Sequence, residues 1–245
     1  MITKTDVIVL WSIKYGESSL IATVLSEEHG KLPLMIRGGR KPKSGFSGMI
    51  QSGNLLHAVY YYKQSRSIQT LTETSYLTRL DQIHQDIEKM AMVMSSMELI
   101  GQLLHEGEVN DSVFQFTKRF LVWLDRAGEV IPATFPYLQI RLAQLIGLEL
   151  QIRGVTAGDE EGYLNIDGGL ITDRPQSDKA VRLSRNQLRF IINVTRSRKV
   201  SNLTGELDGG ERSQLVRFMD DYFRYHLDGL RPRRSDAIFD QILKE

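Results

Sequence analysis

The chain has 245 residues, of which 41% are hydrophobic, with 31 Lys and Arg against 30 Asp and Glu and no cysteine. This composition is typical of a soluble globular protein, and the missing cysteine excludes disulfides, thiolate zinc sites, iron–sulfur clusters and a cysteine nucleophile. No stretch has the roughly 18 consecutive apolar residues that a membrane-spanning helix needs, so we expect a cytoplasmic protein with no membrane segment and no signal peptide.

Charge is distributed unevenly along the chain. Residues 1–80 hold ten Lys and Arg against five Asp and Glu, a net charge of +5, whereas residues 81–245 hold 21 against 25, a net charge of −4. A basic N-terminal part joined to a mildly acidic body favours contact between the first part and a polyanion. The alternative is chance unevenness over a solvated surface.

Residues 1–79 predict a small closed barrel. Apolar runs rich in β-branched residues alternate with Gly, Ser, Asn and Pro, which favours short strands over helices. The expected strands are Thr5–Trp11, Leu20–Leu25, Lys31–Arg37, Asn54–Tyr62 and Ser67–Thr72. Gly38 and Gly39, followed by Pro42 and Gly45, predict a longer connection between the third and fourth strands.

From Leu80 the apolar period changes to that of helices. Spacings of three, four and seven predict one long helix from Leu80 to Leu104, and two further helices follow from about Ser112 and from about Pro136 to Gly147. Short connections between them favour a helical bundle, whose Met and Phe stripes we interpret as core.

Residues 151–178 are rich in glycine and predict a loop or hairpin. Ser184 and Gln187 have the spacing of a capping box and predict the start of a helix. A longer helix is expected over Glu211–Leu227, and a short one after Ser235. The expected domains are therefore 1–79, a helical domain of 80–150 with 180–245, and a Gly-rich region of 151–179.

Common catalytic and cofactor motifs are absent. The sequence has no phosphate loop of the G-x-x-x-x-G-K-[ST] form, no G-x-G-x-x-G, no G-x-S-x-G and no H-E-x-x-H. His84 and Glu88 share a helix face, but a metal site needs a third ligand and no second His lies nearby. We therefore expect no enzyme, no cofactor and no metal.

The main functional signal is a basic loop between the third and fourth expected strands. Four cations and no anion occur within seven residues, namely Arg37, Arg40, Lys41 and Lys43 around Gly38, Gly39 and Pro42. Such a loop suits phosphate binding, because glycine lets the backbone approach while long basic side chains reach several oxygens.

Aromatic residues on the expected strands suit single-stranded nucleic acid, whose bases stack on aromatic faces. The candidates are Trp11, Tyr60, Tyr61 and Tyr62. The strand period places Tyr60 and Tyr62 on one face and Tyr61 on the other, so at least one of the three tyrosines is expected in the barrel core.

Two further basic groups have an open interpretation. Seven cations without an acid lie between Asp178 and Glu206: Lys179, Arg182, Arg185, Arg189, Arg196, Arg198 and Lys199. The spacing of Arg182, Arg185 and Arg189 predicts one helical face, which either extends a nucleic-acid track or balances the acidic loop before it. Arg231, Arg233 and Arg234 have the same ambiguity.

Segments at both ends of the chain match the pattern of one known family. The matching N-terminal residues are Tyr15-Gly16-Glu17-Ser18-Ser19, His29-Gly30-Lys31, Arg37 to Ser44, Gln51, Leu55 and Leu71-Thr72-Glu73. The matching C-terminal residues are Tyr222, His226, Leu227, Gly229, Pro232 and Ser235, with one residue more than the family pattern between Gly229 and Pro232. In these residues the chain resembles the bacterial RecO recombination and repair proteins, and the resemblance covers nearly the whole chain.

The resemblance implies an α+β protein with an N-terminal five-stranded OB-fold barrel, a helical bundle and a small third region. Many members carry a four-cysteine zinc site in that region, but here Gly154 to Gly158 and Gly168 to Arg174 occupy the matching stretches without cysteine. We therefore predict a zinc-less region held by packing and hydrogen bonds.

The resemblance also implies a non-catalytic, nucleoid-associated mediator. Such proteins bind single- and double-stranded DNA, anneal complementary strands, contact the acidic C-terminal tail of the single-stranded-DNA-binding protein, and work with RecR to help load RecA. It assigns DNA contact to Arg37, Arg40, Lys41 and Lys43, with Arg66 as a further candidate. The acidic tail is expected in an apolar groove of the helical part, with Lys118, Arg119 or Arg141 at its rim. The alternative is a protein-interaction adaptor or an RNA-binding OB-fold module.

Overall fold

The computed structural model describes residues 1–42, 44–46, 48–197 and 207–234. Within them the chain forms two compact units, one of Met1–Gly128 with Arg233 and Arg234, and one of Glu129–Pro232. None of the helices described is long and apolar enough to span a bilayer. The division into 1–79, 80–150 with 180–245, and 151–179 stays a prediction about folding domains.

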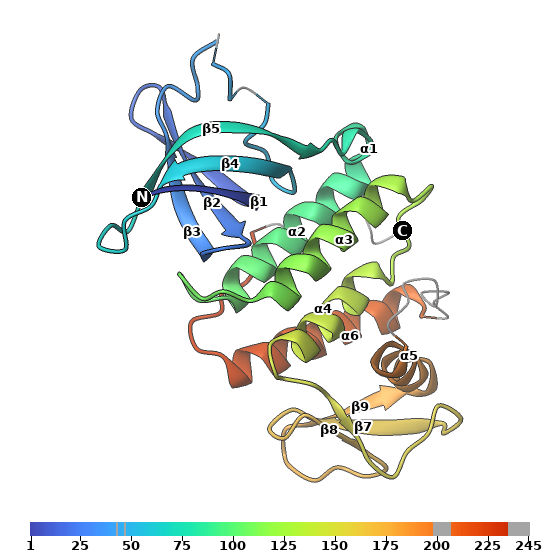
Figure 1. Cartoon of the computed structure of the whole chain (residues 1–245). Helices are drawn as coiled ribbons and strands as arrows, with labels where there is room; N and C mark the ends of the chain where they lie inside the picture. Colours follow the sequence, from blue (N-terminus) through green and yellow to red (C-terminus); the bar gives the residue numbers. More distant parts are fainter. Residues whose placement is uncertain (43, 47, 198–206, 235–245) are drawn as a thin grey trace. The chain divides into compact units, whose positions relative to one another are not determined.

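Five strands of the first unit close into a barrel (Figure 1). They are β1 (Ile2–Tyr15), β2 (Ser19–Ser26), β3 (Gly30–Ile36), β4 (Leu55–Tyr61) and β5 (Gln69–Thr78). Their order is β1-β2-β3-β5-β4, with β3 and β5 parallel and the other pairs antiparallel. The expected OB-type barrel is confirmed.

Strand β1 is longer than the sequence pattern predicts because it has two partners. Its N-terminal half pairs with β4, and its C-terminal half pairs with β2. The two pairings overlap at Val7 and Ile8, and a register shift between Val9 and Trp11 interrupts the pairing with β2. Such bulges bend a strand and increase its twist. The bend lets one strand close both edges of the barrel.

Alternating side chains of these strands fill the barrel. The buried cluster comprises Val7, Val9, Ala22, Val24, Leu32, Leu34, Ile36, Ile50, Leu56, Ala58, Tyr60 and Leu71. Strand β3 shows this alternation directly, because its residues from Gly30 to Ile36 are alternately buried and half-buried. The side-chain period of two therefore fixes the outward-facing residues as well.

The prediction of a single helix from Leu80 to Leu104 is wrong in one respect, because the segment forms two helices. They are α1 (Asp81–Gln85) and α2 (Ile87–Leu103). Asp86 lies between them with an extended backbone, and its carboxylate accepts hydrogen bonds from the amides of Glu88 and Lys89. An aspartate in this role is a strong N-cap, so the local cap overrides the continuous apolar period. Helix α3 (Asp111–Arg126) follows.

Helix α2 packs against β1 through a glycine. A Cβ built on Gly101 would lie 2.1 Å from Cζ3 of Trp11, so the indole occupies the space of a side chain. Two further contacts tie β3 to the end of this helix: the Lys31 ammonium donates to the Gly101 carbonyl at 2.7 Å, and the Gly107 amide donates to the Lys31 carbonyl at 2.8 Å.

We predict that Gly101→Ala destabilises the first unit by about 1–3 kcal/mol, because the added methyl group forces the Trp11 ring to move. Gly128→Ala is the matched control, since a Cβ there meets nothing within 4 Å. Denaturant unfolding of both variants measures the difference in the free energy of unfolding. Equal values would show that the Trp11 ring can move aside without loss of stability.

The second unit combines helices with a small sheet (Figure 1). The helices are α4 (Thr134–Leu145), α5 (Arg185–Arg196) and α6 (Gly209–His226). Both halves of the predicted capping box form, since Ser184 Oγ accepts from the Gln187 amide and the Gln187 side chain accepts from the Ser184 amide. Helix α4 packs against α5 and α6. The short helix expected after Ser235 lies outside the described residues.

The Gly-rich segment forms more structure than a loop. Its strands are β6 (Gln151–Ile152), β7 (Glu161–Asn165) and β8 (Leu170–Thr172), and β9 (Ala180–Ser184) completes a sheet of order β6-β8-β7-β9. The buried Asn165 joins its parts. Its Nδ2 donates to the Leu170 carbonyl at 3.1 Å and to Thr172 Oγ1 at 2.8 Å, while its Oδ1 accepts from the Gln176 amide at 2.7 Å.

We predict that Asn165→Ala costs about 1–3 kcal/mol of unfolding free energy, because buried hydrogen-bonding partners are left unsatisfied. Gln176→Ala serves as the control, since that exposed residue uses its backbone amide in the network. Hydrogen exchange of residues 161–176 should increase in the first variant alone. Unchanged protection would place the stability of this sheet elsewhere.

Candidate nucleic-acid interface

The basic loop begins at the end of β3 and has a shape that requires glycine. Gly38 adopts a φ of +67°, and a Cβ on Gly39 would lie 2.8 Å from the Ile36 side chain. A tight turn follows, in which the Lys41 amide donates to the Gly38 carbonyl at 3.0 Å. Arg37 and Lys41 are exposed. Lys43, the fourth predicted cation, lies outside the described residues.

Arg40 joins this loop to the turn between β1 and β2. Its Nη1 donates to the carbonyls of Gly16 at 3.2 Å and Glu17 at 3.1 Å, and its amide donates to the Ser18 carbonyl at 2.9 Å. The residue nevertheless stays exposed. Arg40 therefore both shapes the loop and adds to its positive charge.

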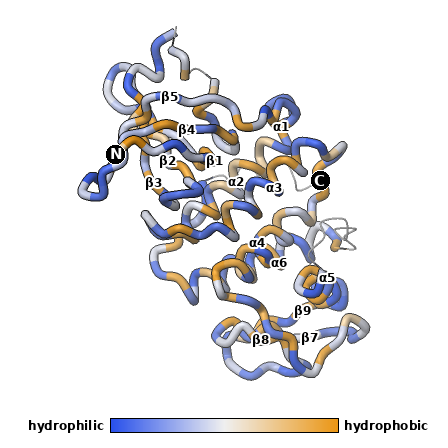
Figure 2. Tube along the Cα trace, viewed as in Figure 1, coloured by the Kyte–Doolittle hydropathy of each residue, from blue (hydrophilic) through white to orange (hydrophobic). Residues whose placement is uncertain are grey.

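Arg66 lies in the exposed turn between β4 and β5, which Figure 2 shows as hydrophilic. The buried Gln69 holds this turn: its Oε1 accepts from the Lys63 amide at 2.9 Å, and its Nε2 donates to the carbonyls of Lys63 at 3.1 Å and Arg66 at 2.7 Å. The side chains of Lys63 and Arg66 remain exposed.

The structure separates the aromatic candidates. Tyr60 is buried in the barrel, the Trp11 ring packs on Gly101, and the Tyr62 ring stacks on His29 with centroids 3.7 Å apart. Tyr61 is 51% exposed, in agreement with the predicted alternation. Tyr15, which is 52% exposed, was missed as a stacking candidate because the predicted first strand ended at Trp11.

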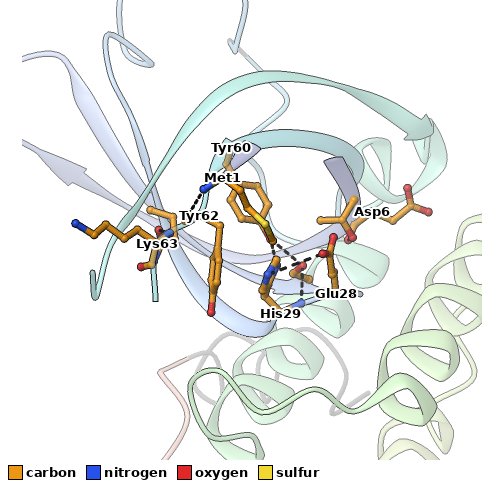
Figure 3. A network of polar contacts seen from close by, with 10 residues as sticks. Met1, Asp6, Glu28, His29, Tyr60, Tyr62 and Lys63 are labelled. Atoms are coloured by element: carbon orange, nitrogen blue, oxygen red, sulfur yellow. Dashed lines mark hydrogen bonds and ion pairs between the residues drawn. The ribbon is translucent and has the colours of Figure 1, made fainter. Parts of the chain in front are cut away.

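A polar network fixes the β2–β3 turn against β4 (Figure 3). The Tyr60 hydroxyl lies 2.9 Å from His29 Nδ1 and 3.1 Å from Ser26 Oγ. The N-terminal ammonium donates to the Tyr62 carbonyl at 2.8 Å. Burial raises the pKa of Tyr60 from its ordinary value of 10.0 to about 12, despite the opposing hydrogen bond from Ser26.

We predict that the protein loses stability between about pH 10 and pH 12, because Tyr60 ionises in the unfolded chain before it ionises in the fold. Tyr60→Phe should reduce this decline relative to the native chain, while Tyr15→Phe, with its exposed hydroxyl, should not. Denaturant unfolding at several alkaline pH values measures it. The same decline in all three proteins would contradict the assignment to Tyr60.

The three candidates for the acidic-tail rim lie in different settings. Lys118 Nζ forms an ion pair with Asp6 Oδ2 at 3.1 Å, and Asp6 Oδ1 also lies 2.6 Å from His57 Nδ1. Arg119 is exposed on α3, and Arg141 on α4 donates to Gln144. The first two belong to the first unit and Arg141 to the second. The groove for the acidic tail therefore stays a prediction.

The second basic group is partly neutralised by the acidic loop before it. Arg182 pairs with Glu161, and Arg185 pairs with Glu160 at 3.0 Å. The prediction that Arg182 shares a helical face with Arg185 and Arg189 is wrong, because Arg182 lies on β9 and the helix begins at Arg185. These contacts support the balancing interpretation for two of the cations. Arg198 and Lys199 lie outside the described residues.

The remaining sequence candidates have structural contacts. Arg233 is 8% exposed, and the Arg234 amide donates to Glu98 Oε1 at 2.8 Å. His84 Nε2 lies 2.8 Å from Asn54 Oδ1. In the part of the chain that the structure describes, no group of three or more His, Cys, Asp or Glu side chains is placed to hold a metal ion.

Comparison with known proteins identifies relatives over the whole chain. The model of the Recombination protein O N-terminal domain matches residues 1–79, and that of the Recombination protein O C-terminal domain matches residues 84–236. The chain is similar to a DNA repair protein RecO of Salinibacter ruber, with 30% identity over 98% of this chain and 94% of that protein. It is also similar to RecO of Chlorobium limicola, with 29% identity over the full length of both.

Proposed function

We propose that this chain, which belongs to the RecO family, is a non-catalytic mediator of DNA repair and recombination. The observation that carries the proposal is the basic loop on the barrel, where Arg37, Arg40 and Lys41 are exposed around two glycines that fix its shape. We assign DNA contact to these residues with Lys43 and Arg66. The partners of this surface are single-stranded and double-stranded DNA.

Annealing follows from the same electrostatics. Two complementary strands repel each other through their phosphates, and cations that neutralise those phosphates release counterions and lower the repulsion. A surface that binds single strands with bases accessible lets two of them meet and pair. No group on the barrel has to make or break a covalent bond for this reaction.

The proposal extends to proteins that act on coated single strands. The mediator would bind the acidic tail of the single-stranded-DNA-binding protein, act with RecR, and help RecA load in the nucleoid. Lys118, Arg119 and Arg141 are our candidates for the tail. Arg119 is the best placed of them, because it is exposed while Lys118 is paired with Asp6 and Arg141 bonds to Gln144.

We predict that alanine replacement of Arg37, Arg40, Lys41 and Lys43 together weakens binding of labelled single-stranded DNA. Each phosphate contact contributes about 0.7 to the slope of log affinity against log salt for single strands, so the salt dependence should also flatten. Titrations at several salt concentrations measure both quantities.

The matched control replaces four other exposed arginines, Arg79, Arg126, Arg153 and Arg224, by alanine. It changes the net charge by the same amount and should keep most of the affinity and the slope. Equal losses of DNA affinity in the two variants would show that the loop acts only through the net charge of the protein. Equal affinity for RNA and DNA would favour an RNA-binding module instead.

A further inference from the structure

An apolar row of cross-strand neighbours runs round the outside of the barrel. The register pairs Ile13 with Ile21, Ile21 with Met35, Met35 with Thr70, Thr70 with Tyr61, and Tyr61 with Ile2. Directly paired residues share one face of a sheet. The neighbours of these positions along each strand, such as Leu34, Leu71 and Tyr60, point into the core, so the whole row faces outward.

The row is unusually apolar for an outer surface. Ile2 is 59% exposed, Ile13 54% and Tyr61 51%, while Ile21, Met35 and Thr70 are half-buried. Thr70 is the one residue of the row with an aliphatic hydroxyl, and the row contains no charge. Contiguous exposed apolar surface of this kind marks a binding site more often than scattered apolar residues do.

Cations flank the row on two opposite sides. Arg37 comes two residues after Met35 on β3, and Lys63 comes two residues after Tyr61 on β4. Strand β3 is parallel to β5 and β4 is antiparallel to it, so the two directions are opposed. Arg37 follows the last residue of β3, and Lys63 lies just beyond the last residue of β4, so the two cations lie past opposite sides of the row.

The β4–β5 side forms a distinct surface, which we call the turn patch. It consists of Ile2, Tyr61, Lys63, Arg66 and Ile68, all of them exposed. The turn between Tyr61 and Ile68 holds two cations and no acid. The nearest acids along the strands are Glu73 on β5, which pairs with Val59, and Asp6 on β1, four residues after Ile2. Glu28 lies 4.0 Å from His29, whose ring stacks on Tyr62.

We propose that the turn patch is a second single-strand subsite, in which an unpaired base stacks on Tyr61 while Lys63 and Arg66 hold the backbone. This inference rests on the proposed function, and it assigns the DNA contact of Arg66 to a second strand, separate from the strand bound at the basic loop. The apolar row between the two sides then carries bases of both strands, with the two backbones on opposite rims. Such an arrangement places two single strands close enough to pair.

Charge and chemistry together select nucleic acid as the occupant. An aromatic face beside cations is the combination that binds single strands without sequence preference, because every base has a face that stacks and every nucleotide has a phosphate. Gln69 holds the turn in place through both polar ends of its amide. The patch is therefore preorganised rather than formed by the ligand.

The test counts short oligonucleotides bound to the full chain. Native mass spectrometry or fluorescence titration with non-complementary oligonucleotides should give two per chain for the native protein. Tyr61→Ala should weaken the affinity for the second oligonucleotide by about 5- to 150-fold, the loss expected for one stacked base. Its affinity for the first oligonucleotide should stay within about twofold of the native value. Tyr61→Phe should retain the second, since stacking does not need the hydroxyl. Annealing of complementary oligonucleotides should be slower in Tyr61→Ala than in the native protein and unchanged in Tyr61→Phe.

The outcomes separate this inference from the proposed function. A single oligonucleotide per chain, or equal binding and annealing by Tyr61→Ala and the native protein, would overturn the second subsite and leave the basic loop intact. The basic-loop variant is expected to lose the first oligonucleotide. If that variant still bound it with native affinity, the result would contradict the proposed function instead. If Tyr61→Ala lost binding of an acidic peptide and kept both oligonucleotides, the patch would be a protein-docking surface and the inference would be wrong.

Discussion

The pairing of β1 with two neighbours is the constraint on which the barrel depends. One strand hydrogen-bonds to β4 along its first half and to β2 along its second, and a bulge between Val9 and Trp11 interrupts the register with β2. A slip of β4 by one residue against β1 would exchange the inner and outer side chains of β4. Tyr60 would then leave the core and Tyr61 would enter it. The outer surface and the buried cluster are thus two results of a single register.

Local signals of the sequence predicted local structure well. The Ser184 and Gln187 spacing predicted a capping box that forms completely, and the Gly38-Gly39 pair predicted the connection after β3. The break at Asp86 was missed because the apolar period continues through it, while one carboxylate caps the next helix. The strand β9 was missed because Arg182 has a spacing that suits a helix as well as a strand edge.

The sequence predicted which residues of the candidate site are charged, but it did not predict the contacts that those residues make. The sequence shows that Arg37, Arg40 and Lys41 are cations in one loop. Only the fold shows that Arg40 donates hydrogen bonds to two carbonyls of another turn. The same holds for Lys118, whose partner Asp6 lies 112 residues away in the sequence. Long-range partners of this kind decide which basic side chains are available for a ligand, and no spacing rule supplies them.

Strand β3 also has a mechanical consequence. Its first part is tied to the end of α2 through Lys31, and its last residue leads directly into the basic loop. A polymer that pulls on this loop loads β3 along its own length. Strand β3 has seven register pairs with β2 and is also paired with β5. The hydrogen bonds between these strands are therefore loaded in shear and must break together. Tension applied at this loop would therefore be transmitted to α2 before it opened the barrel.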